Sequence, residues 1–335
     1  MRILFNTAGG KTREKELGLG HIFRCMNLAN ELKPNKIYFQ IEDFGHVKNI
    51  LQKNGYKDVF LNSKKSNVTN DIKKTLEIIK KYKIDILIID KFTTDKKFPK
   101  IMKEYITTVV ISDLNKIDFD ADLIVNGFIG YKNKIVKNQY GVRCLIGPRY
   151  QILNKNFNKK TVFKKKYTLL VTFGGFDERN IISVFCNVIE KYLDKITVRI
   201  ILGPETKQHL GLKKLQKNNM GKLSIVKHTN DMKTEMSRAK YGLCSGGITS
   251  YEFAIMKIPF AIICQYPHQM KTALEWQKNG IAKNLGFSFN KLEQKISRYI
   301  ENIIEEKISF PKNSNIDVYG TQLIAQEIIK LGKKR

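Results

Sequence analysis

The 335-residue sequence has no apolar run that approaches the roughly 18 residues a transmembrane helix needs, and residues 1–5 resemble a β-strand and not a signal peptide. Its five cysteines lie far apart, and none forms a close pair typical of a zinc or redox motif. Their odd number favours a reducing compartment. These absences predict a cytoplasmic protein that needs neither a metal ion nor another cofactor.

Acidic residues are also scarce, since 31 Asp and Glu stand against 60 Lys and Arg, for a formal charge of +29. Only ten of the cations are Arg, so Lys carries the excess, which is typical of a composition bias on solvated helices. Attraction to an anionic substrate and a weak peripheral contact with a membrane surface are the other interpretations. No nucleic-acid partner is expected, because no binding motif with interleaved aromatic residues is present.

Short runs rich in Ile, Val and Leu alternate with longer segments of helical period, as in parallel βα units. With 335 residues this pattern predicts an α/β fold of two Rossmann-like, doubly wound domains with a ligand cleft between them. The predicted strands are 2–5, 37–41, 58–61, 84–89, 108–111 and 123–125, then 168–173, 197–202, 223–226, 241–243 and 260–264. The predicted helices are 22–32, 72–82, 179–192, 232–239, 250–256, 269–278, 292–305 and 321–331.

The alternation breaks at 143–166, where Gly147-Pro148 is followed by a stretch rich in Lys and Asn. We therefore expect an N-terminal domain at 1–145, a linker at 146–166 and a C-terminal domain at 167–320. A last helix with a basic tail is expected at 321–335.

A first glycine-rich junction, Gly18-Leu19-Gly20-His21, follows a polar loop at 7–17 and directly precedes the helix 22–32. Gly18 and Gly20 allow close backbone approach, and the unpaired N–H groups of a helix start suit an anion. The positive end of the helix dipole disfavours imidazolium, which would keep His21 neutral and basic. A neutral histidine facing the expected cleft is a candidate base for activating water, but an ordinary helix-start histidine fits the motif equally well.

A second junction ends the strand 168–173 in Gly174-Gly175 at the start of the second half. Backbone amides of these two glycines are expected at the mouth of the cleft. Asp177, which follows them, is expected to cap the next helix. This junction therefore contributes backbone groups to a substrate site.

The third junction is the most informative, because Gly246-Gly247 is followed by a helix that opens with Thr249 and Ser250. Hydroxyls and helix N–H groups in this arrangement suit a diphosphate. Glu252, in the first turn, either caps the helix or accepts the two hydroxyls of a ribose. The absence of Gly-Lys-Ser or Gly-Lys-Thr disfavours a Walker A kinase, and the incomplete G-x-G-x-x-G disfavours a nicotinamide dehydrogenase.

The motifs in this order resemble the GT-B superfamily of nucleotide-sugar enzymes, and specifically the UDP-sugar hydrolase of pseudaminic acid biosynthesis with its spore-coat polysaccharide relatives. The similarity covers almost the whole chain. The matching segments are Gly18-Leu19-Gly20-His21-Ile22-Phe23-Arg24-Cys25 with Leu28-Ala29, Leu87-Ile88-Ile89-Asp90, Asp122-Leu123-Ile124-Val125-Asn126, Leu145-Ile146-Gly147-Pro148-Arg149-Tyr150, Val171-Thr172-Phe173-Gly174-Gly175 and Gly246-Gly247-Ile248-Thr249-Ser250-Tyr251-Glu252.

The resemblance implies that His21 activates water and that a UDP-linked acetamido sugar is cleaved to UDP and free sugar. It places the diphosphate at Gly246, Gly247 and Thr249 and the ribose at Glu252. The N-terminal domain would then receive the sugar and the C-terminal domain would bind UDP, in nonulosonic acid or surface polysaccharide biosynthesis.

Four further residues complete the candidate substrate-binding set. Asp90 and Asn126 end predicted strands in the first half, although a strand-end Asp often caps the next turn. His268 and Gln269 follow a buried strand of the second half, where loops often turn toward ligands. The set as a whole comprises Gly18, Gly20, Asp90, Asn126, Gly174, Gly175, Gly246, Gly247, Thr249, Ser250, Glu252, His268 and Gln269, with His21 as the catalytic residue.

The sequence departs from the family pattern in the first half. Asp90 is followed by Lys91-Phe92 where relatives usually have His-Tyr. The sequence therefore does not determine which sugar the protein binds. The second half also looks like the glycosyltransferase that adds N-acetylglucosamine in peptidoglycan synthesis. A GT-B glycosyltransferase with a hydroxyl acceptor is therefore the alternative, and a nucleotide-sugar binding protein without chemistry is a third hypothesis.

Overall fold

The computed structural model describes every residue except 12–15, 46, 63–66, 159–162, 205, 207–209, 230, 310–313 and 334–335. The chain divides into two compact units. Unit 1 comprises Met1–Lys155 together with Asp317–Arg335, and unit 2 comprises Asn156–Ile316. The C-terminal helix, which the sequence set apart at 321–335, thus belongs to the N-terminal unit.

Unit 1 is built around a mixed sheet with the strand order β4-β3-β1-β5-β6-β7-β9-β8, and β2 pairs with β1. All neighbours are parallel except β1 with β2 and β8 with β9. The strands are β1 (Arg2–Lys11), β2 (Glu16–Gly18), β3 (Lys36–Phe44), β4 (Val59–Leu61), β5 (Ile86–Asp90), β6 (Thr107–Ile111), β7 (Leu123–Asn126), β8 (Lys134–Lys137) and β9 (Arg143–Ile146). The helices are α1 (Gly20–Glu31), α2 (Val47–Lys53), α3 (Val68–Tyr82), α4 (Lys97–Tyr105) and α11 (Gly320–Gly332).

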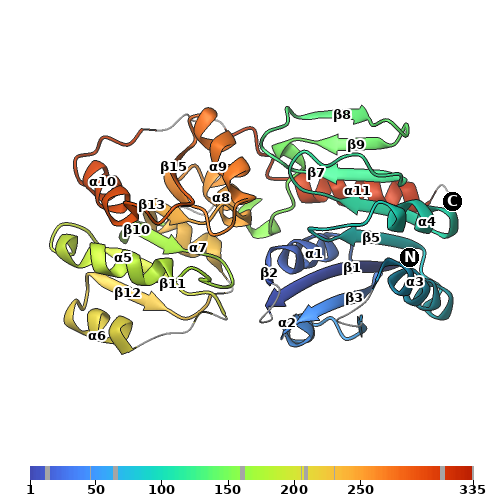
Figure 1. Ribbon diagram of the computed structural model, residues 1–335, viewed down its shortest axis with the longest axis horizontal. Helices are drawn as coiled ribbons and strands as arrows, with labels where there is room; N and C mark the ends of the chain where they lie inside the picture. Colours follow the sequence, from blue (N-terminus) through green and yellow to red (C-terminus); the bar gives the residue numbers. More distant parts are fainter. Residues whose placement is uncertain are drawn as a thin grey trace. The chain divides into compact units, whose positions relative to one another are not determined.

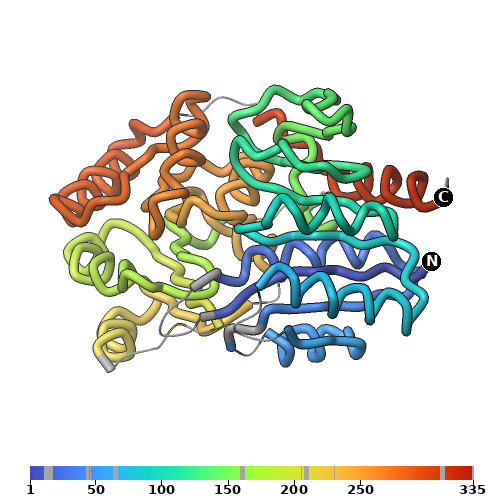
Figure 2. Tube along the Cα trace, turned by 45° about the vertical axis from the view of Figure 1, so that its right-hand side comes forward, coloured from blue at the N-terminus to red at the C-terminus, as the bar shows by residue number. Residues whose placement is uncertain are grey.

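The two faces of this sheet carry different helices. Leu4 of β1 packs in one hydrophobic cluster with Ile78 of α3 and Met102 of α4. On the other face α11, red in Figures 1 and 2, lies beside α1 although the two are at opposite ends of the sequence. Gly332 lets the end of α11 pack closely on β5, since a Cβ there would come within 2.6 Å of the Ile86 side chain. The last helix therefore completes the first domain.

Unit 2 has a fully parallel sheet with the order β12-β11-β10-β13-β14-β15. Its strands are β10 (Tyr167–Thr172), β11 (Val198–Ile201), β12 (Leu223–Val226), β13 (Ala239–Cys244), β14 (Phe260–Ile263) and β15 (Ala282–Gly286). Its helices are α5 (Ile181–Ile189), α6 (Leu210–Asn218), α7 (Met232–Ser237), α8 (Ile248–Ile255), α9 (Gln269–Lys278) and α10 (Leu292–Ile304). Short 3₁₀ turns lie at Pro148–Tyr150 in unit 1, at Lys155–Asn158 where the chain passes between the units, and at Glu190–Tyr192 in unit 2. Helices α5 and α10 pack side by side (Figure 1) on one hydrophobic cluster with β10.

Both sheets contain the doubly wound order in which the chain moves outward from a central strand and then restarts on its other side. The order reverses between β1 and β5 in unit 1 and between β10 and β13 in unit 2. Ligands of open α/β sheets bind at such points, beyond the carboxyl ends of the strands. The prediction of two Rossmann-like α/β domains is confirmed.

Two local predictions were wrong. The expected polar loop at 7–17 is strand as far as Lys11, because β1 continues its parallel pairing with β3 up to Gly10 opposite Phe44. The expected break at 143–166 begins with β9, which pairs with β7. In both places pairing with a neighbouring strand supplies the backbone hydrogen bonds. The sequence run itself is too short or too polar to predict a strand.

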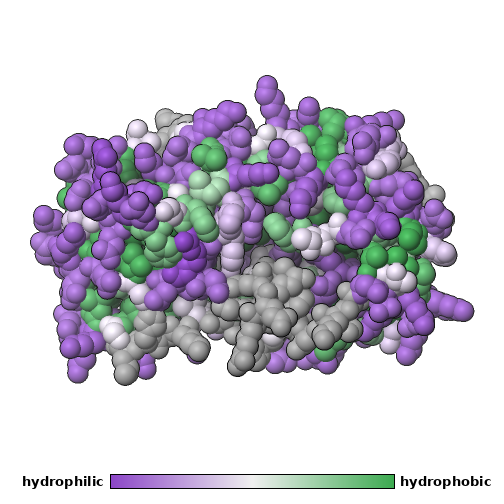
Figure 3. All heavy atoms as spheres, viewed as in Figure 1, coloured by the Kyte–Doolittle hydropathy of each residue, from purple (hydrophilic) through white to green (hydrophobic). Residues whose placement is uncertain are grey.

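Hydrophilic side chains cover most of the described surface on the face drawn in Figure 3, with hydrophobic ones in small groups between them. This distribution fits lysines spread over solvated faces. Among the described residues no helix is both long and apolar enough to cross a membrane.

Candidate functional site

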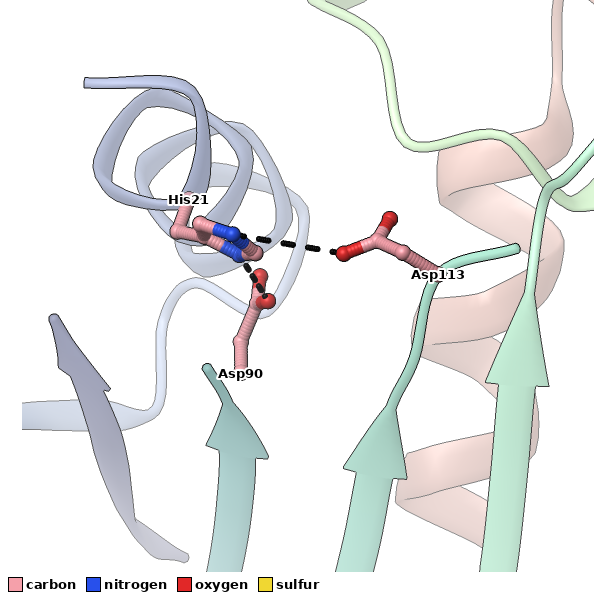
Figure 4. Close-up of side chains that lie close together, drawn as sticks. All are labelled: His21, Asp90 and Asp113. Carbon is pink, nitrogen blue, oxygen red and sulfur yellow. Dashed lines mark hydrogen bonds and ion pairs between the residues drawn. The ribbon is translucent and has the colours of Figure 1, made fainter. Parts of the chain in front are cut away.

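The first candidate site lies at the reversal point of unit 1, where the start of α1 meets the end of β5. The Nδ1 atom of His21 lies 2.7 Å from Oδ1 of Asp90, which is completely buried (Figure 4). On the other side of the ring, Nε2 of His21 lies 4.0 Å from Oδ2 of Asp113, which follows β6. The imidazole therefore lies between two carboxylates that come from neighbouring strands.

Arg24, one turn along α1, holds both carboxylates in place. Its Nε and one terminal nitrogen bind Asp90 at 2.9 and 2.5 Å, and its terminal nitrogens bind Asp113 at 2.6 and 3.0 Å. Such two-point contacts fix the orientation of a carboxylate as well as its charge. Burial lowers the pKa of Arg24, but Asp113 and Asp90 outweigh it and hold the pKa above its usual value. Arg24 is thus a permanent cation in the floor of the site.

These contacts assign the proton on His21. We assign the imidazole hydrogen to Nδ1, because the ionised Asp90 accepts there at 2.7 Å and the nearby Arg24 nitrogen also donates to Asp90 and Asp113. The Nδ1 atom of His21 then donates its hydrogen to Asp90, which leaves the lone pair on Nε2. A histidine held in this way is oriented to accept a proton at Nε2.

The two carboxylates beside His21 stay ionised. Burial by itself raises the pKa of Asp90, but the charge of Arg24 and the contact with His21 reverse this and hold the pKa well below its usual range. Asp113 follows the same pattern, with burial opposed by Arg24, and its pKa is also lowered. Two carboxylates and one guanidinium leave one net negative charge, which an imidazolium at His21 would neutralise.

The same three side chains have the composition of a metal site, since donor atoms of His21, Asp90 and Asp113 all lie within 4.8 Å of one another. Arg24 already binds both carboxylates, and its positive charge opposes the binding of a divalent cation there. The donor set in this arrangement fits a histidine that is oriented by a carboxylate better than a metal ion.

The backbone around His21 is shaped by glycines. Gly18 has a φ of +67°, a conformation that favours glycine, and it connects β2 to α1. Gly9 of β1 lies directly under the helix, since a Cβ there would come within 2.5 Å of the Ile22 side chain. Gly20 is the first residue of α1 and has open space around it. The glycine turn thus brings the start of α1 down onto the end of β1.

The sequence did not single out Arg24, although it lies within the motif that carries the resemblance. A charged residue among the apolar positions of an amphipathic helix is the signal that could have found it. Asn126 was predicted to contact substrate but is completely buried, and its amide nitrogen donates to Ser112, Leu114 and Lys116. It fastens the loop that carries Asp113.

The second candidate site lies at the reversal point of unit 2. The Gly174-Gly175 turn follows β10, and Gly203 follows β11 directly beneath it. A Cβ on Gly203 would come within 2.2 Å of the Gly174 oxygen and 2.3 Å of the Gly175 oxygen. Asp177 accepts hydrogen bonds from two backbone amides at the start of α5, so the predicted capping role is confirmed.

The Gly246-Gly247 turn follows β13 and leads into α8. Gly246 lies against the start of α9, where a Cβ would come within 2.9 Å of Gln269. The backbone N–H groups of the first turn of α8 form a suitable place for an anion. The predicted diphosphate residues thus share one edge of one sheet with Gly174 and Gly175.

Two polar side chains at the start of α8, Ser250 and Thr249, are buried. The Ser250 hydroxyl donates to the Gly247 oxygen at 2.7 Å and accepts from the buried Trp276 at 3.0 Å. Thr249 is also buried, with 8% of its surface exposed. Ser250 therefore fastens the glycine turn and α9 to each other.

Glu252 is partly buried, and burial raises its pKa to about 7. The side chain therefore titrates near neutral pH, a property often found at functional sites.

The loop after β14 is held close to the other two. The Gln265 side chain donates to the Phe173 oxygen at 2.6 Å, and its oxygen accepts from the Glu178 amide at 3.0 Å. Gln269 accepts from the Gln265 amide at 2.8 Å, and the His268 ring stacks on Tyr266 at 5.5 Å. Gln265, which the sequence analysis did not single out, connects the loops after β10 and β14.

Comparisons with known proteins agree with this architecture. No protein-family model matches the chain. It is 29% identical over 273 residues to an uncharacterized protein of Methanocaldococcus jannaschii, covering 75% of this chain and only 54%, about half, of that protein's length. It is 25% identical over 289 residues to the spore coat polysaccharide biosynthesis protein SpsG of Bacillus subtilis, covering 81% of this chain and 80% of SpsG.

Solved structures show the same fold at low identity. MurG of Acinetobacter baumannii matches with a TM-score of 0.62 at 14% identity, covering 98% of this chain and all of that chain. A UDP-GlcNAc 2-epimerase of Neisseria meningitidis matches at 0.54 and 13%, with full coverage of both. A UDP-glucosyltransferase of Polygonum tinctorium matches at 0.61 and 9%, covering 99% and 93%. The chain has the GT-B fold.

Proposed function

We propose that this chain is a nucleotide-sugar enzyme that hydrolyses a UDP-linked acetamido sugar to UDP and the free sugar. The observation that carries the proposal is the contact of His21 with Asp90, which leaves Nε2 of the imidazole ready to take a proton from water. The similarity to SpsG supports a place in surface polysaccharide or nonulosonic acid biosynthesis. Structural neighbours whose names include UDP-sugars support the choice of donor.

In the proposed reaction, Nε2 of His21 removes a proton from a water molecule as its oxygen bonds to the anomeric carbon. The bond between that carbon and the diphosphate oxygen breaks, and its electron pair leaves with UDP. The imidazolium that forms is stabilised by Asp90 at Nδ1 and by the nearby charge of Asp113. Arg24 keeps both carboxylates ionised throughout.

We assign the nucleotide to unit 2. The diphosphate would bind the amides of Gly246, Gly247 and the first turn of α8, where developing negative charge on the leaving group is stabilised. Glu252 would accept the ribose hydroxyls. Gly174 and Gly175 lie at the same reversal point and would contribute backbone groups.

The test is release of UDP from a panel of UDP-linked N-acetylated sugars with no acceptor present. We expect His21→Gln to abolish release while binding of UDP, measured by calorimetry, is retained. His228→Gln changes an exposed histidine of unit 2 and serves as the control. Unchanged release by His21→Gln would remove His21 as the base.

The alternative is a glycosyltransferase in which the same Nε2 takes the proton of an acceptor hydroxyl. This alternative is supported by the fold that the chain shares with MurG and with a UDP-glucosyltransferase. Tight binding of a UDP-sugar with no UDP release in the absence of an acceptor would select this alternative.

A further inference from the structure

A cavity of about 230 Å³ lies in unit 1, on the side of the sheet that α3 and α4 cover. It is formed where β3 and β5 end and where α3 and α4 begin. Lys91, which directly follows Asp90 in the chain, lines it. The residues that matter for its chemistry are Glu42, Val68, Asp71, Lys91, Thr93 and Phe98. The cavity is smaller than the roughly 300 to 1,000 Å³ typical of whole-ligand pockets, and so it suits one part of a ligand.

A buried ion triad gives the cavity its polar side. The Lys91 ammonium is 8% exposed and donates to Glu42 at 2.8 Å and to Asp71 at 2.7 Å. An ammonium has three hydrogens, and these two contacts use two of them. A donor on a buried cation thus remains available to an acceptor that enters the cavity.

A polar network under the cavity fixes this triad. Asp71 accepts from the side chains of Asn62 and Gln40, and Gln40 accepts from Thr75 at 2.9 Å. These residues are buried, and the hydrogen bonds among them offset the cost of burying their polar groups. A network of this kind is rigid. Lys91 is therefore held at a defined position.

Apolar side chains also line the cavity. The Phe98 ring is 3% exposed and lies 5.6 Å from the Lys91 ammonium, and Val68, the first residue of α3, is also part of the lining. A ligand group that fits must combine a hydrogen-bond acceptor, a donor and a small apolar end. A secondary amide with a methyl group has all three.

We propose that this cavity is the subsite for the N-acetyl group of the sugar. The Lys91 ammonium donates to the amide oxygen, the Glu42 carboxylate accepts the amide N–H, and the methyl group packs on Val68 and Phe98. This inference rests on the proposed function, because it names the part of the sugar that unit 1 recognises. Lys91 is a specificity-determining residue in this assignment.

The charge of the cavity also excludes a competing class of sugar. The carboxylates of Glu42, Asp71 and Asp95 outnumber the Lys91 ammonium by two charges. A sugar with a carboxylate at this position would add a further negative charge in a partly buried place, which is unfavourable. Neutral acetamido sugars are therefore preferred to uronic acids.

The test uses saturation-transfer NMR on the full chain with UDP-N-acetylglucosamine, and with free N-acetylglucosamine at millimolar concentration. Thr93 is exposed and lines the cavity, so Thr93→Tyr fills the opening without disturbing the interior. Gln52→Tyr places the same side chain on the exposed face of α2 and is the control. Lys91→Met removes the charge and keeps the length of the side chain.

We expect saturation transfer to the acetyl methyl group to fall about tenfold in Thr93→Tyr and to be retained in Gln52→Tyr. Lys91→Met should lower the preference for the N-acetyl sugar over UDP-glucose by a similar factor. An acetyl signal that is unchanged in Thr93→Tyr, or absent from the unmodified protein while the uridine signals are present, overturns the subsite.

The two proposals fail in different ways. A cavity-dependent acetyl signal with no His21-dependent UDP release supports the subsite and removes the hydrolase. UDP release that is independent of Thr93 and Lys91 supports the hydrolase and removes the subsite.

Discussion

The Nδ1 atom of His21 lies 2.7 Å from Oδ1 of Asp90, a residue 69 positions further along the chain. Helix α1 and strand β5 meet there because β1 and β5 are neighbours in the sheet. The contact converts a helix-start histidine into an oriented base.

Replacing Asp90 by Asn should lower turnover by about 100-fold or more while UDP binding stays within about twofold. An amide nitrogen at this position can donate to Nδ1, which would place the hydrogen on Nε2 and remove the base. UDP release at saturating substrate, together with calorimetric UDP binding, measures the effect. Asp194→Asn, an exposed change in unit 2, is the control, and equal turnover in the two variants would contradict the assigned tautomer.

Removing the guanidinium in Arg24→Met should destabilise the protein by about 3 kcal/mol, because the buried carboxylate of Asp90 and the partly exposed one of Asp113 lose their partner. Chemical denaturation at pH 7 measures this. Arg298→Met, an exposed change on α10, should stay within about 0.5 kcal/mol.

The same variant should weaken the acid response of unit 1. In the unmodified protein the lowered pKa values of Asp90 and Asp113 add stability above about pH 3.9 that is lost as the pH falls. Without Arg24, burial raises both pKa values and only His21 still lowers them, so less stability should be lost as the pH falls. Unfolding free energies at several pH values give the slope, and an unchanged slope would contradict the role of Arg24.

Glu252→Gln should increase stability at pH 8 by roughly 3 kcal/mol. The raised pKa of about 7 means that the folded protein holds a proton which the unfolded chain has released above about pH 4.3. Stability contributed by this residue is therefore lost as the pH rises from about 4.3 through 7. Denaturation curves should show a flatter pH dependence in the variant, and an identical dependence would refute the assignment.

Glu252→Gln should also weaken binding of a UDP-sugar, since a carboxylate accepts two ribose hydroxyls better than an amide does. In the unmodified protein, affinity should rise as the pH increases through about 7 and Glu252 ionises. Calorimetry with a UDP-sugar at pH 6 and pH 8 tests both points. Equal affinities of the two proteins at pH 8 would remove Glu252 from the ribose site.

Gly203→Ala should weaken UDP-sugar binding about tenfold or more, because its Cβ would displace the Gly174-Gly175 turn. In Gly211→Ala, at the start of α6, the added Cβ meets no atom within 4 Å. That control should bind normally and gain up to about 1 kcal/mol of stability. Normal binding by Gly203→Ala would show that the turn takes no part in the site.

The sequence by itself determined the alternation of strands and helices, the two Rossmann-like domains and the glycine turns before α1 and α8. Hydrophobic period and turn chemistry are local properties, and they can be read without knowing which strands become neighbours. Local signals were weakest where pairing decides the structure, as in the continuation of β1 to Lys11 and in strand β9.

Only the tertiary structure decided which side chains meet. Arg24 reaches Asp90 and Asp113 across 66 and 89 positions, because the strand order places the ends of β5 and β6 side by side under α1. The return of 317–335 to unit 1 and the Lys91 triad have the same origin. Contacts between residues far apart in sequence depend on the order of strands in the sheet, and no local pattern carries that order.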